Sequence, residues 1–162
     1  MPDNTQNHFW LLWQHTSNIL EKNFDAILVK EKGLSYQQFQ VLLALMQNGE
    51  NTVPTSTVLA RQLDRNPNTL STILDRMEKG GLVKKIRDQA DRRVVRIEVT
   101  EKGKQQLIEG IDTGRKIIKV ITSVFSEEEL KTFNELLEKF EKTTKEKLTP
   151  RKVPREEKVY DI

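Results

Sequence analysis

The sequence predicts a mainly α-helical protein that carries a single two-stranded β-hairpin. Along most of the chain, apolar residues recur at spacings of three and four, which is the period of an amphipathic helix. Residues 82–99 differ, because β-branched residues alternate there with polar ones around a charged turn. With 162 residues and a hydrophobic fraction of 36%, the chain predicts one domain whose thin core is completed by pairing with a second copy.

The first two helices are predicted from their apolar residues and from the residues that start and stop them. The stripe over residues 9–28 predicts one long helix that ends near Gly33. Ser35 and Gln38 have the spacing of a capping box, which opens a second helix. The polar run at residues 49–52 closes that second helix.

Two shorter helices joined by a tight turn come next. The first carries Leu59 and Leu63 on its apolar face. The second has Asn66 as its N-cap and Pro67 at its first position, where the missing N–H costs nothing. It is stopped at Gly80. Its predicted buried residues are Leu70, Ile73, Leu74 and Met77.

The hairpin and the C-terminal helices complete the prediction. Residues 82–87 and 94–99 are the expected strands. A helix starting at Thr100 has apolar positions between Leu107 and Phe125, among them Ile108, Ile111, Ile117, Ile118 and Ile121. A second capping box at Ser126 and Glu129 opens a last helix, and the tail after residue 148 is expected to be disordered or extended.

Positive charge is concentrated around the two short helices and the hairpin. Residues 61–104 hold twelve Lys and Arg against seven Asp and Glu, a balance of +5, whereas residues 1–60 balance to −2 and residues 105–162 to zero. A basic stripe of this kind indicates phosphate contact, although solvated surface helices produce such patches too. A short polar-faced helix beside a basic hairpin has the shape of a DNA reader.

The order of these elements and their residue motifs resemble the MarR family of winged helix-turn-helix regulators. The match covers about residues 35–103. The motifs that carry it are Leu59-Ala60, Leu63, Asp75-Arg76-Met77-Glu78-Lys79, Gly81-Leu82-Val83, Asp91-Arg92-Arg93 and Val99-Thr100-Glu101-Lys102-Gly103.

The resemblance implies an architecture and a mode of action. It implies an N-terminal dimerisation helix (1–34), a winged helix-turn-helix domain (35–103), C-terminal dimerisation helices (104–148) and a tail (149–162). It further implies a homodimer that binds a pseudo-palindromic operator in double-stranded DNA, usually as a repressor. Small aromatic or phenolic effectors relieve repression in such proteins.

The helix from residue 67 onward is expected to read the major groove with its N-terminal, outward residues. These candidates are Asn66, Pro67, Asn68, Thr69, Ser71, Thr72 and Arg76. For Asn68, a capping role beside Asn66 is the alternative to contact with adenine. Members of the family commonly carry a long cation where this chain has Pro67 and Thr72, which predicts an A·T-rich site or heavier reliance on the hairpin.

The hairpin is expected to act as the wing. An arginine at its tip can enter a narrow minor groove, held by a bidentate pair with Asp91. The wing candidates are Arg87, Asp91, Arg92 and Arg93, and Arg92 takes either the groove or a phosphate. Further phosphate contacts are expected from Ser56, Thr57, Arg61, Arg65, Lys79 and Lys84.

Other classes of site find little support in the sequence. The absence of cysteine excludes thiol chemistry and thiolate metal sites, and His8 and His15 are too far apart to share a metal without other ligands. No cofactor motif, signal peptide or membrane span is found, so we expect a cytoplasmic protein that is not an enzyme. The aromatic residues of the first helix are either dimer packing or an effector pocket, with Trp10, Trp13, His15 and Phe24 as the candidates.

Two functional hypotheses remain open at this level. The first is the effector-responsive DNA-binding regulator. The second is a winged-helix dimer that serves as a protein-interaction module without specific DNA binding, an alternative that the departures at Pro67 and Thr72 leave open.

Overall fold

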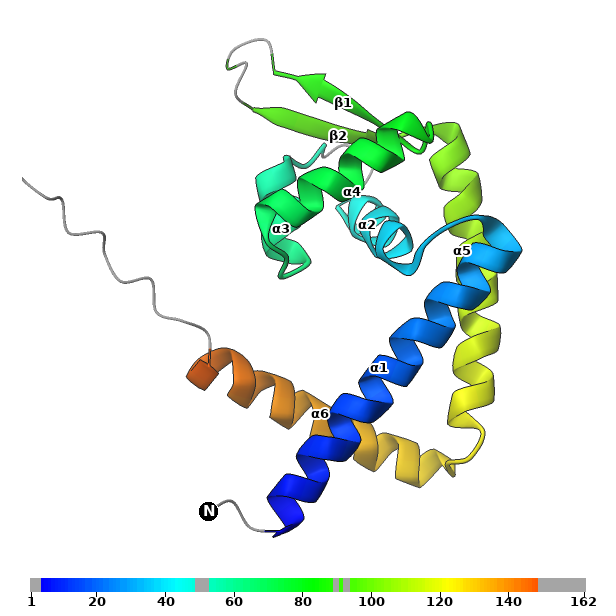
Figure 1. The fold of residues 1–162 in the computed structure, drawn as a ribbon, viewed down its shortest axis with the longest axis vertical. Coiled ribbons are helices and arrows are strands. Elements are labelled where there is room, and N and C mark those ends of the chain that lie inside the picture. Colours follow the sequence, from blue (N-terminus) through cyan, green and yellow to red (C-terminus); the bar gives the residue numbers. More distant parts are fainter. Residues whose placement is uncertain (1–3, 49–52, 89–90, 92–93, 149–162) are drawn as a thin grey trace, which may run out of the picture. The chain divides into compact units, whose positions relative to one another are not determined.

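The computed structural model describes residues 4–48, 53–88, 91 and 94–148. Within them the chain forms six helices and one two-stranded antiparallel sheet (Figure 1). The elements are α1 (Asn4–Lys32), α2 (Tyr36–Gln47), α3 (Ser56–Gln62), α4 (Pro67–Lys79), β1 (Val83–Arg87), β2 (Val95–Val99), α5 (Glu101–Thr122) and α6 (Glu127–Leu148). The predicted class, mainly helical with one hairpin, is confirmed. None of the described helices is long and apolar enough to cross a membrane.

The chain divides into two compact units, Met1–Ile118 and Lys119–Ile162, which are described separately. The first unit contains the core. Its centre is formed by side chains that are almost wholly removed from solvent: Leu28, Leu34, Leu42, Leu59, Leu70, Leu74, Met77 and Ile97. One cluster therefore joins the end of α1, helices α2 to α4 and the sheet.

Local capping fixes the start of α2, as predicted. The Ser35 hydroxyl accepts a hydrogen bond from the Gln38 backbone N–H at 3.2 Å, and the Gln38 side chain accepts one from the Ser35 N–H at 3.0 Å. Asp25 on α1 adds a third contact, because its carboxylate accepts from the Tyr36 N–H at 2.8 Å. These bonds satisfy donors that a helix start leaves open, and they join α2 to α1.

Two glycines allow α5 to pack closely within the first unit. A Cβ at Gly110 would lie 2.9 Å from the Phe39 ring, and one at Gly114 would lie 3.4 Å from Phe24. Polar contacts continue this packing, since Thr113 is buried and its hydroxyl lies 3.1 Å from the Glu31 carboxylate. A glycine inside a helix can weaken the helix or allow close packing, and at these two positions the structure shows close packing.

The sheet is a hairpin with Val83 opposite Val99 and Arg87 opposite Val95. A third segment lies along the other side of β2, because the Ile97 N–H donates to the Pro54 carbonyl at 3.0 Å and Thr55 bridges to Arg96. β2 therefore pairs with β1 on one side and, on the other, with one segment that is distant in sequence.

The second unit contains α6. Its capping box forms as predicted, with the Ser126 N–H donating to the Glu129 carboxylate at 2.8 Å and the Glu129 N–H donating to the Ser126 hydroxyl at 3.2 Å. The sequence placed Phe125 among the apolar positions of the preceding helix, but α5 ends at Thr122. Phe125 instead lies in the connection to α6 and stacks on Phe133, with ring centroids 5.7 Å apart.

Candidate nucleic-acid interface

Helix α4 is held on the core with its polar face outward. It begins at Pro67 because the Asn66 side chain accepts a hydrogen bond from the Asn68 backbone N–H at 2.9 Å. The apolar face predicted for this helix, Leu70, Ile73, Leu74 and Met77, is buried. The position of α4 is thus set by packing, which leaves its opposite face available for a partner.

The residues predicted to read DNA share that outward face. Asn66, Pro67, Asn68, Thr69, Ser71, Thr72 and Arg76 are all exposed. The structure assigns the cap to the side chain of Asn66, and Asn68 contributes only its backbone N–H to it. The Thr72 hydroxyl donates to the Asn68 carbonyl at 3.1 Å, so it is tied to the helix backbone.

The turn between α3 and α4 has an unusual backbone at Asp64. Its φ is 50°, and it is the one described residue other than glycine in the left-handed region. Aspartate tolerates this conformation better than branched residues do. The turn therefore orients α4 against α3 without a glycine. No local sequence pattern predicted the left-handed backbone at Asp64.

The predicted phosphate contacts differ in their surroundings. Arg61, Thr57, Lys79 and Lys84 are exposed, whereas Ser56 and Arg65 are half-buried. Arg65 donates from Nη2 to the Gln40 side chain on α2 at 2.8 Å, so its guanidinium is partly engaged inside the protein.

Thr55 is a residue that sequence reasoning missed. Its side chain accepts a hydrogen bond from the Val58 N–H at 3.2 Å and caps α3. A threonine three residues before the first apolar position of the helix is the signal that identifies it.

The wing is supported by Arg96, which the sequence did not include among the site residues. Arg96 Nε lies 3.0 Å from the Asp88 carboxylate, and Nη1 donates to the Val53 carbonyl at 3.2 Å. The end of the hairpin is closed further by the Asp88 N–H, which donates to the Val94 carbonyl at 3.0 Å. The strands therefore carry their own internal ion pair.

The two wing candidates that the structure describes, Arg87 and Asp91, lie near the end of the hairpin. Arg87, at the end of β1, and Asp91 are exposed, and the Asp91 carbonyl accepts a hydrogen bond from the Val94 N–H at 2.9 Å. Arg92 and Arg93 lie outside the described residues.

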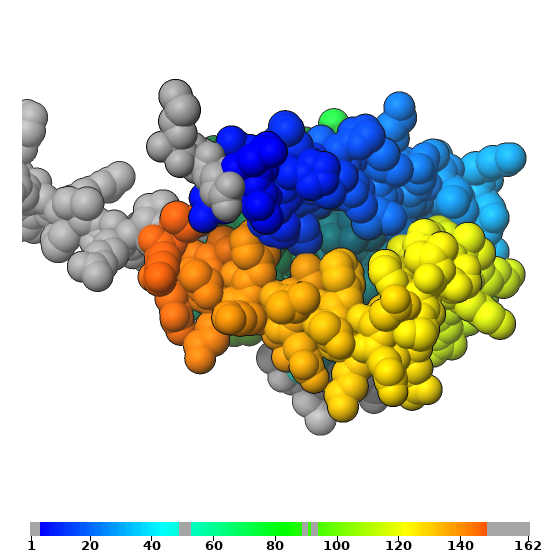
Figure 2. Space-filling model, turned by 90° about the horizontal axis from the view of Figure 1, so that it is seen from below, coloured from blue at the N-terminus to red at the C-terminus, as the bar shows by residue number. Residues whose placement is uncertain are grey.

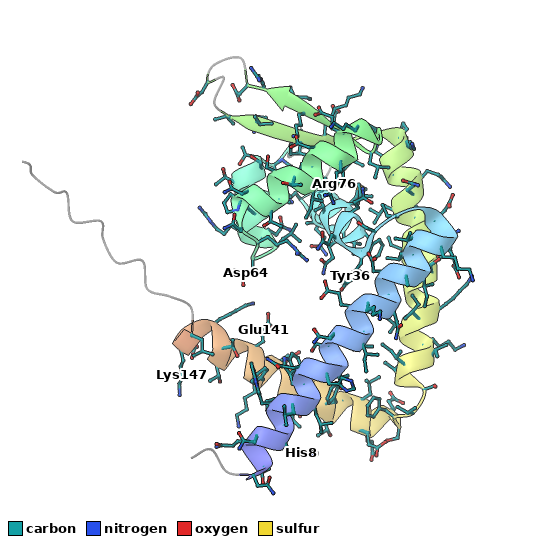
Figure 3. All side chains as sticks on the ribbon, in the orientation of Figure 1. His8, Tyr36, Asp64, Arg76, Glu141 and Lys147 are labelled. Carbon is teal, nitrogen blue, oxygen red and sulfur yellow. The ribbon has the colours of Figure 1, made fainter. Side chains whose placement is uncertain are left out.

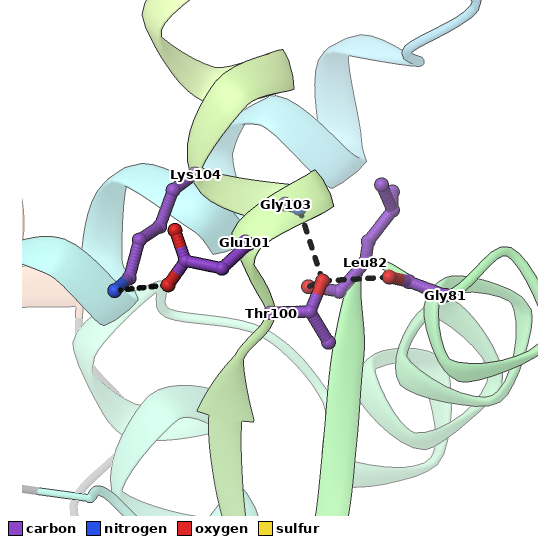
Figure 4. Close-up of polar contacts among 6 residues, drawn as sticks. All are labelled: Gly81, Leu82, Thr100, Glu101, Gly103 and Lys104. Atoms are coloured by element: carbon purple, nitrogen blue, oxygen red, sulfur yellow. Dashed lines mark hydrogen bonds and ion pairs between the residues drawn. The ribbon is translucent and has the colours of Figure 1, made fainter.

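A hydroxyl-centred joint ties the wing to α5 (Figure 4). The Thr100 hydroxyl shares its one proton between the carbonyls of Gly81, at 2.6 Å, and Leu82, at 3.1 Å, and accepts from the Gly103 N–H at 3.0 Å. Lys102 adds a contact to the same loop, since its Nζ lies 2.8 Å from the Gly80 carbonyl. The turn after α4 and the start of α5 are therefore held together at several atoms.

A pocket of about 480 Å³ opens between α1, the start of α2 and α4. Tyr36 and Arg76, both labelled in Figure 3, line it from α2 and α4. The α1 side contributes charged side chains, including Glu21, Lys22 and Asp25. Arg76, predicted as a DNA contact, thus also lines a pocket.

The predicted effector residues lie elsewhere on α1. Trp10, Trp13 and His15 are exposed on its N-terminal half, which is blue in Figure 2. Phe24 is half-buried and packs against Tyr36, with ring centroids 5.0 Å apart. These four residues do not line the pocket described above.

Metal chemistry has no visible basis in the part of the chain that the structure describes. No group of three or more His, Cys, Asp or Glu side chains is arranged there to hold an ion.

Comparison with known proteins shows which family has this sequence and fold. The family model for the transcriptional regulators SarA and Rot matches residues 23–110. The regulator MgrA of Staphylococcus aureus is 34% identical over 110 residues, covering 68% of this chain and 71% of MgrA.

Two solved structures extend the similarity. One is the organohalide-sensing regulator RdhR-CbdbA1625 in its 2,4-dichlorophenol-bound form, with a TM-score of 0.80, 26% identity and coverage of 88% of this chain and 83% of that one. The other is reduced AbfR bound to DNA, with a TM-score of 0.70, 27% identity and coverage of 90% and 95%. With an exposed polar helix beside a wing and these matches, the chain belongs to the MarR/SarA family of winged helix-turn-helix, DNA-binding transcriptional regulators, and it is not an enzyme.

Proposed function

We propose that this regulator acts in the cytoplasm as a homodimeric repressor that binds a pseudo-palindromic operator and is released by a small molecule. The observation that carries the proposal is the exposed N-terminal face of α4. Asn68, Thr69 and Ser71 present short polar side chains there, while the apolar face anchors the helix. Such side chains suit the edges of bases in the major groove.

The wing and its neighbours supply the proposed backbone contacts. Arg61, Lys79, Lys84 and Arg87 are exposed cations on α3, α4 and β1. Asp91, Arg92 and Arg93 are proposed for the adjacent minor groove. Because Arg65 is engaged with Gln40, we expect a smaller contribution from it than from Arg61.

The proposed dimer is supported by apolar surface on the terminal helices. Phe9, Trp10, Leu11 and Leu12 on α1 are 47–65% exposed, and no residue of α6 is buried. A large exposed apolar surface of this kind indicates an interaction site. A second copy offers the matching surface by symmetry.

A noncovalent effector is the proposed means of release. The chain has no cysteine, so an oxidant has no thiol to modify. One structural relative was crystallised with 2,4-dichlorophenol, which supports a small aromatic or phenolic ligand. The pocket beside Arg76 is the better candidate site than the surface around Trp10, Trp13 and His15, because its occupant would touch α4 directly.

A binding experiment tests the proposal. Purified protein is titrated against the duplex upstream of its own gene and against a random duplex of equal length, at several salt concentrations. We expect preference for the upstream duplex and an affinity that falls steeply with salt. Equal affinity for both duplexes would instead support the protein-interaction module.

The effector is tested in the same assay. A panel of phenols and aromatic acids is added to the complex, with Arg76→Ala as the variant and Arg115→Ala, at an exposed position of α5, as its control. We expect an active compound to release the wild type and the control, and to release Arg76→Ala much less.

A further inference from the structure

Lys85, in the basic stretch of the wing, is held by two carboxylates of the recognition helix α4. The Lys85 backbone N–H donates to the Glu78 carboxylate at 3.1 Å. Its side-chain Nζ forms an ion pair with Asp75, one helical turn before Glu78. One residue of β1 is therefore attached to α4 at both its main chain and its side chain.

Strand geometry separates Lys85 from its neighbour Lys84. Successive residues of a strand point to opposite faces, so Lys85 shares the face of buried Val83, whereas Lys84 points the other way. The Lys85 side chain is 21% exposed, whereas Lys84 is exposed to solvent. Two adjacent lysines that look alike in the sequence thus have different surroundings.

The Asp75 carboxyl carries a negative charge at neutral pH. The hydrogen bond from Lys85, and then its positive charge, lower the pKa of the Asp75 carboxyl. Asp75 is ionised, and its negative charge offsets the positive charge of Lys85 in the ion pair. A neutralised cation adds little to the attraction for phosphates, which depends on uncompensated charge.

The attachment lies at the base of the wing. Lys85 pairs with Ile97 on β2, whose side chain is in the core, and the strands run from there toward the tip. An ion pair from α4 to this position limits how far the hairpin can tilt relative to the recognition helix. Since helix and wing would enter neighbouring grooves, their relative angle decides whether both can bind at once.

We propose that Lys85 is a positioning residue for DNA recognition: through Asp75 and Glu78 it sets the wing against α4, and it does not itself neutralise a phosphate. This role rests on the proposed contact between the wing and DNA. The role also explains the presence of Asp75, an acidic residue, on a helix that would face DNA. Asp75 holds the lysine and does not contact a base.

Three variants test the proposal on the full chain: Lys85→Met, Asp75→Ala and, as the matched control, Lys84→Met. Methionine keeps an unbranched apolar stem of similar length and removes the charge. For each variant, affinity for the operator is measured as a function of salt, hydroxyl-radical footprints are recorded, and circular dichroism and thermal melting verify the fold.

We expect Lys85→Met to weaken binding by about ten-fold and to lose protection only at the wing flanks, with the salt slope reduced by more than about one because the wing's own phosphate contacts are lost with it. The control Lys84→Met should reduce the slope by about one, the signature of a lost phosphate contact. Asp75→Ala is the most decisive variant, because removing a negative charge beside DNA should tighten binding unless the wing is displaced. We expect weaker binding, and no additional loss in the double variant Asp75→Ala/Lys85→Met.

The opposite results overturn the role. A slope reduced by about one in Lys85→Met with the wing flanks still protected, or tighter binding by Asp75→Ala, would make Lys85 an ordinary phosphate contact. Additive losses in the double variant would also contradict a shared function. If the wild type protects the wing flanks and Lys85→Met keeps that protection, this proposal fails alone; if the wild type leaves the flanks unprotected, the proposed wing contact fails and this role fails with it.

Discussion

Asp64 shows how a single backbone angle determines the turn between α3 and α4. Its φ of 50° is tolerated by aspartate and asparagine but crowds a branched side chain. We expect Asp64→Val to lower the free energy of unfolding by about 1–2 kcal/mol. Urea denaturation measures the change, and Asp64→Asn should stay close to the wild type. Equal stability of the Val and Asn variants would show that the turn relaxes.

Gly103 and Gly33 form a matched pair for a second prediction. A Cβ at Gly103 would overlap the Leu82 carbonyl oxygen and lie 2.9 Å from Val99, whereas one at Gly33 would meet nothing within 4 Å. Gly33 has a φ of +63°, so its alanine variant carries backbone strain alone. We expect a loss of about 1 kcal/mol for Gly33→Ala and more than about 2 kcal/mol for Gly103→Ala, from thermal and urea unfolding. The reverse order would mean that α5 shifts easily at the Thr100 joint.

At the scale of elements, carboxylates at helix ends and helix contacts make folding depend on pH. Hydrogen bonds from Ser126, mainly from its backbone N–H, lower the pKa of Glu129 at the start of α6. A hydrogen bond from Gln105, and then the charge of Lys32, lower the pKa of Glu109 on α5. Because both groups are more acidic when folded, their stabilisation is present above the unfolded pKa of about 4.3 and is lost as pH falls through the folded pKa.

We therefore expect little pH dependence from these groups between about pH 6 and 8, and a fall in the free energy of unfolding below about pH 4.5. Urea unfolding at a series of pH values measures it. In Glu129→Gln the amide keeps the hydrogen bond of the capping box but does not titrate, so the acid-side loss should be smaller. An identical acid profile in the variant and the wild type would contradict a role for Glu129.

The elements also show what local sequence can predict. The caps at Ser35, Asn66 and Ser126 were predictable because each bond joins residues two or three apart. The end of α5 was not, since the apolar spacing runs on to Phe125 while that ring stacks on Phe133 of the next helix. Periodicity records which side of a helix is apolar, and it does not record what that side meets.

At the scale of the whole molecule, the exposed apolar surface of the terminal helices leads to a prediction about assembly. Leu136 on α6 is 60% exposed in the single chain, so replacing it costs the fold of that chain little. If α6 lies in the proposed dimer interface, Leu136→Glu buries a charge there and should shift the protein to a monomer. Sedimentation velocity at micromolar concentration measures the mass, with Glu135→Gln as the control. A dimeric Leu136→Glu variant would place the interface elsewhere.

Sequence alone determined the fold class, the helix caps at Ser35, Asn66 and Ser126, the buried face of α4 and the strands of the wing. Those features depend on residues that are close together in the chain, so their spacing is sufficient. It also identified the basic segment, but it did not distinguish the cations within it.

Tertiary structure made that distinction. Lys85 is paired with Asp75 ten residues away, Arg65 with Gln40 twenty-five away, and Arg96 with the Val53 carbonyl forty-three away. Whether a cation is available to DNA depends on which acceptors folding brings beside it. The pocket at Arg76 arises in the same way, since its walls come from three helices that meet only in the folded chain.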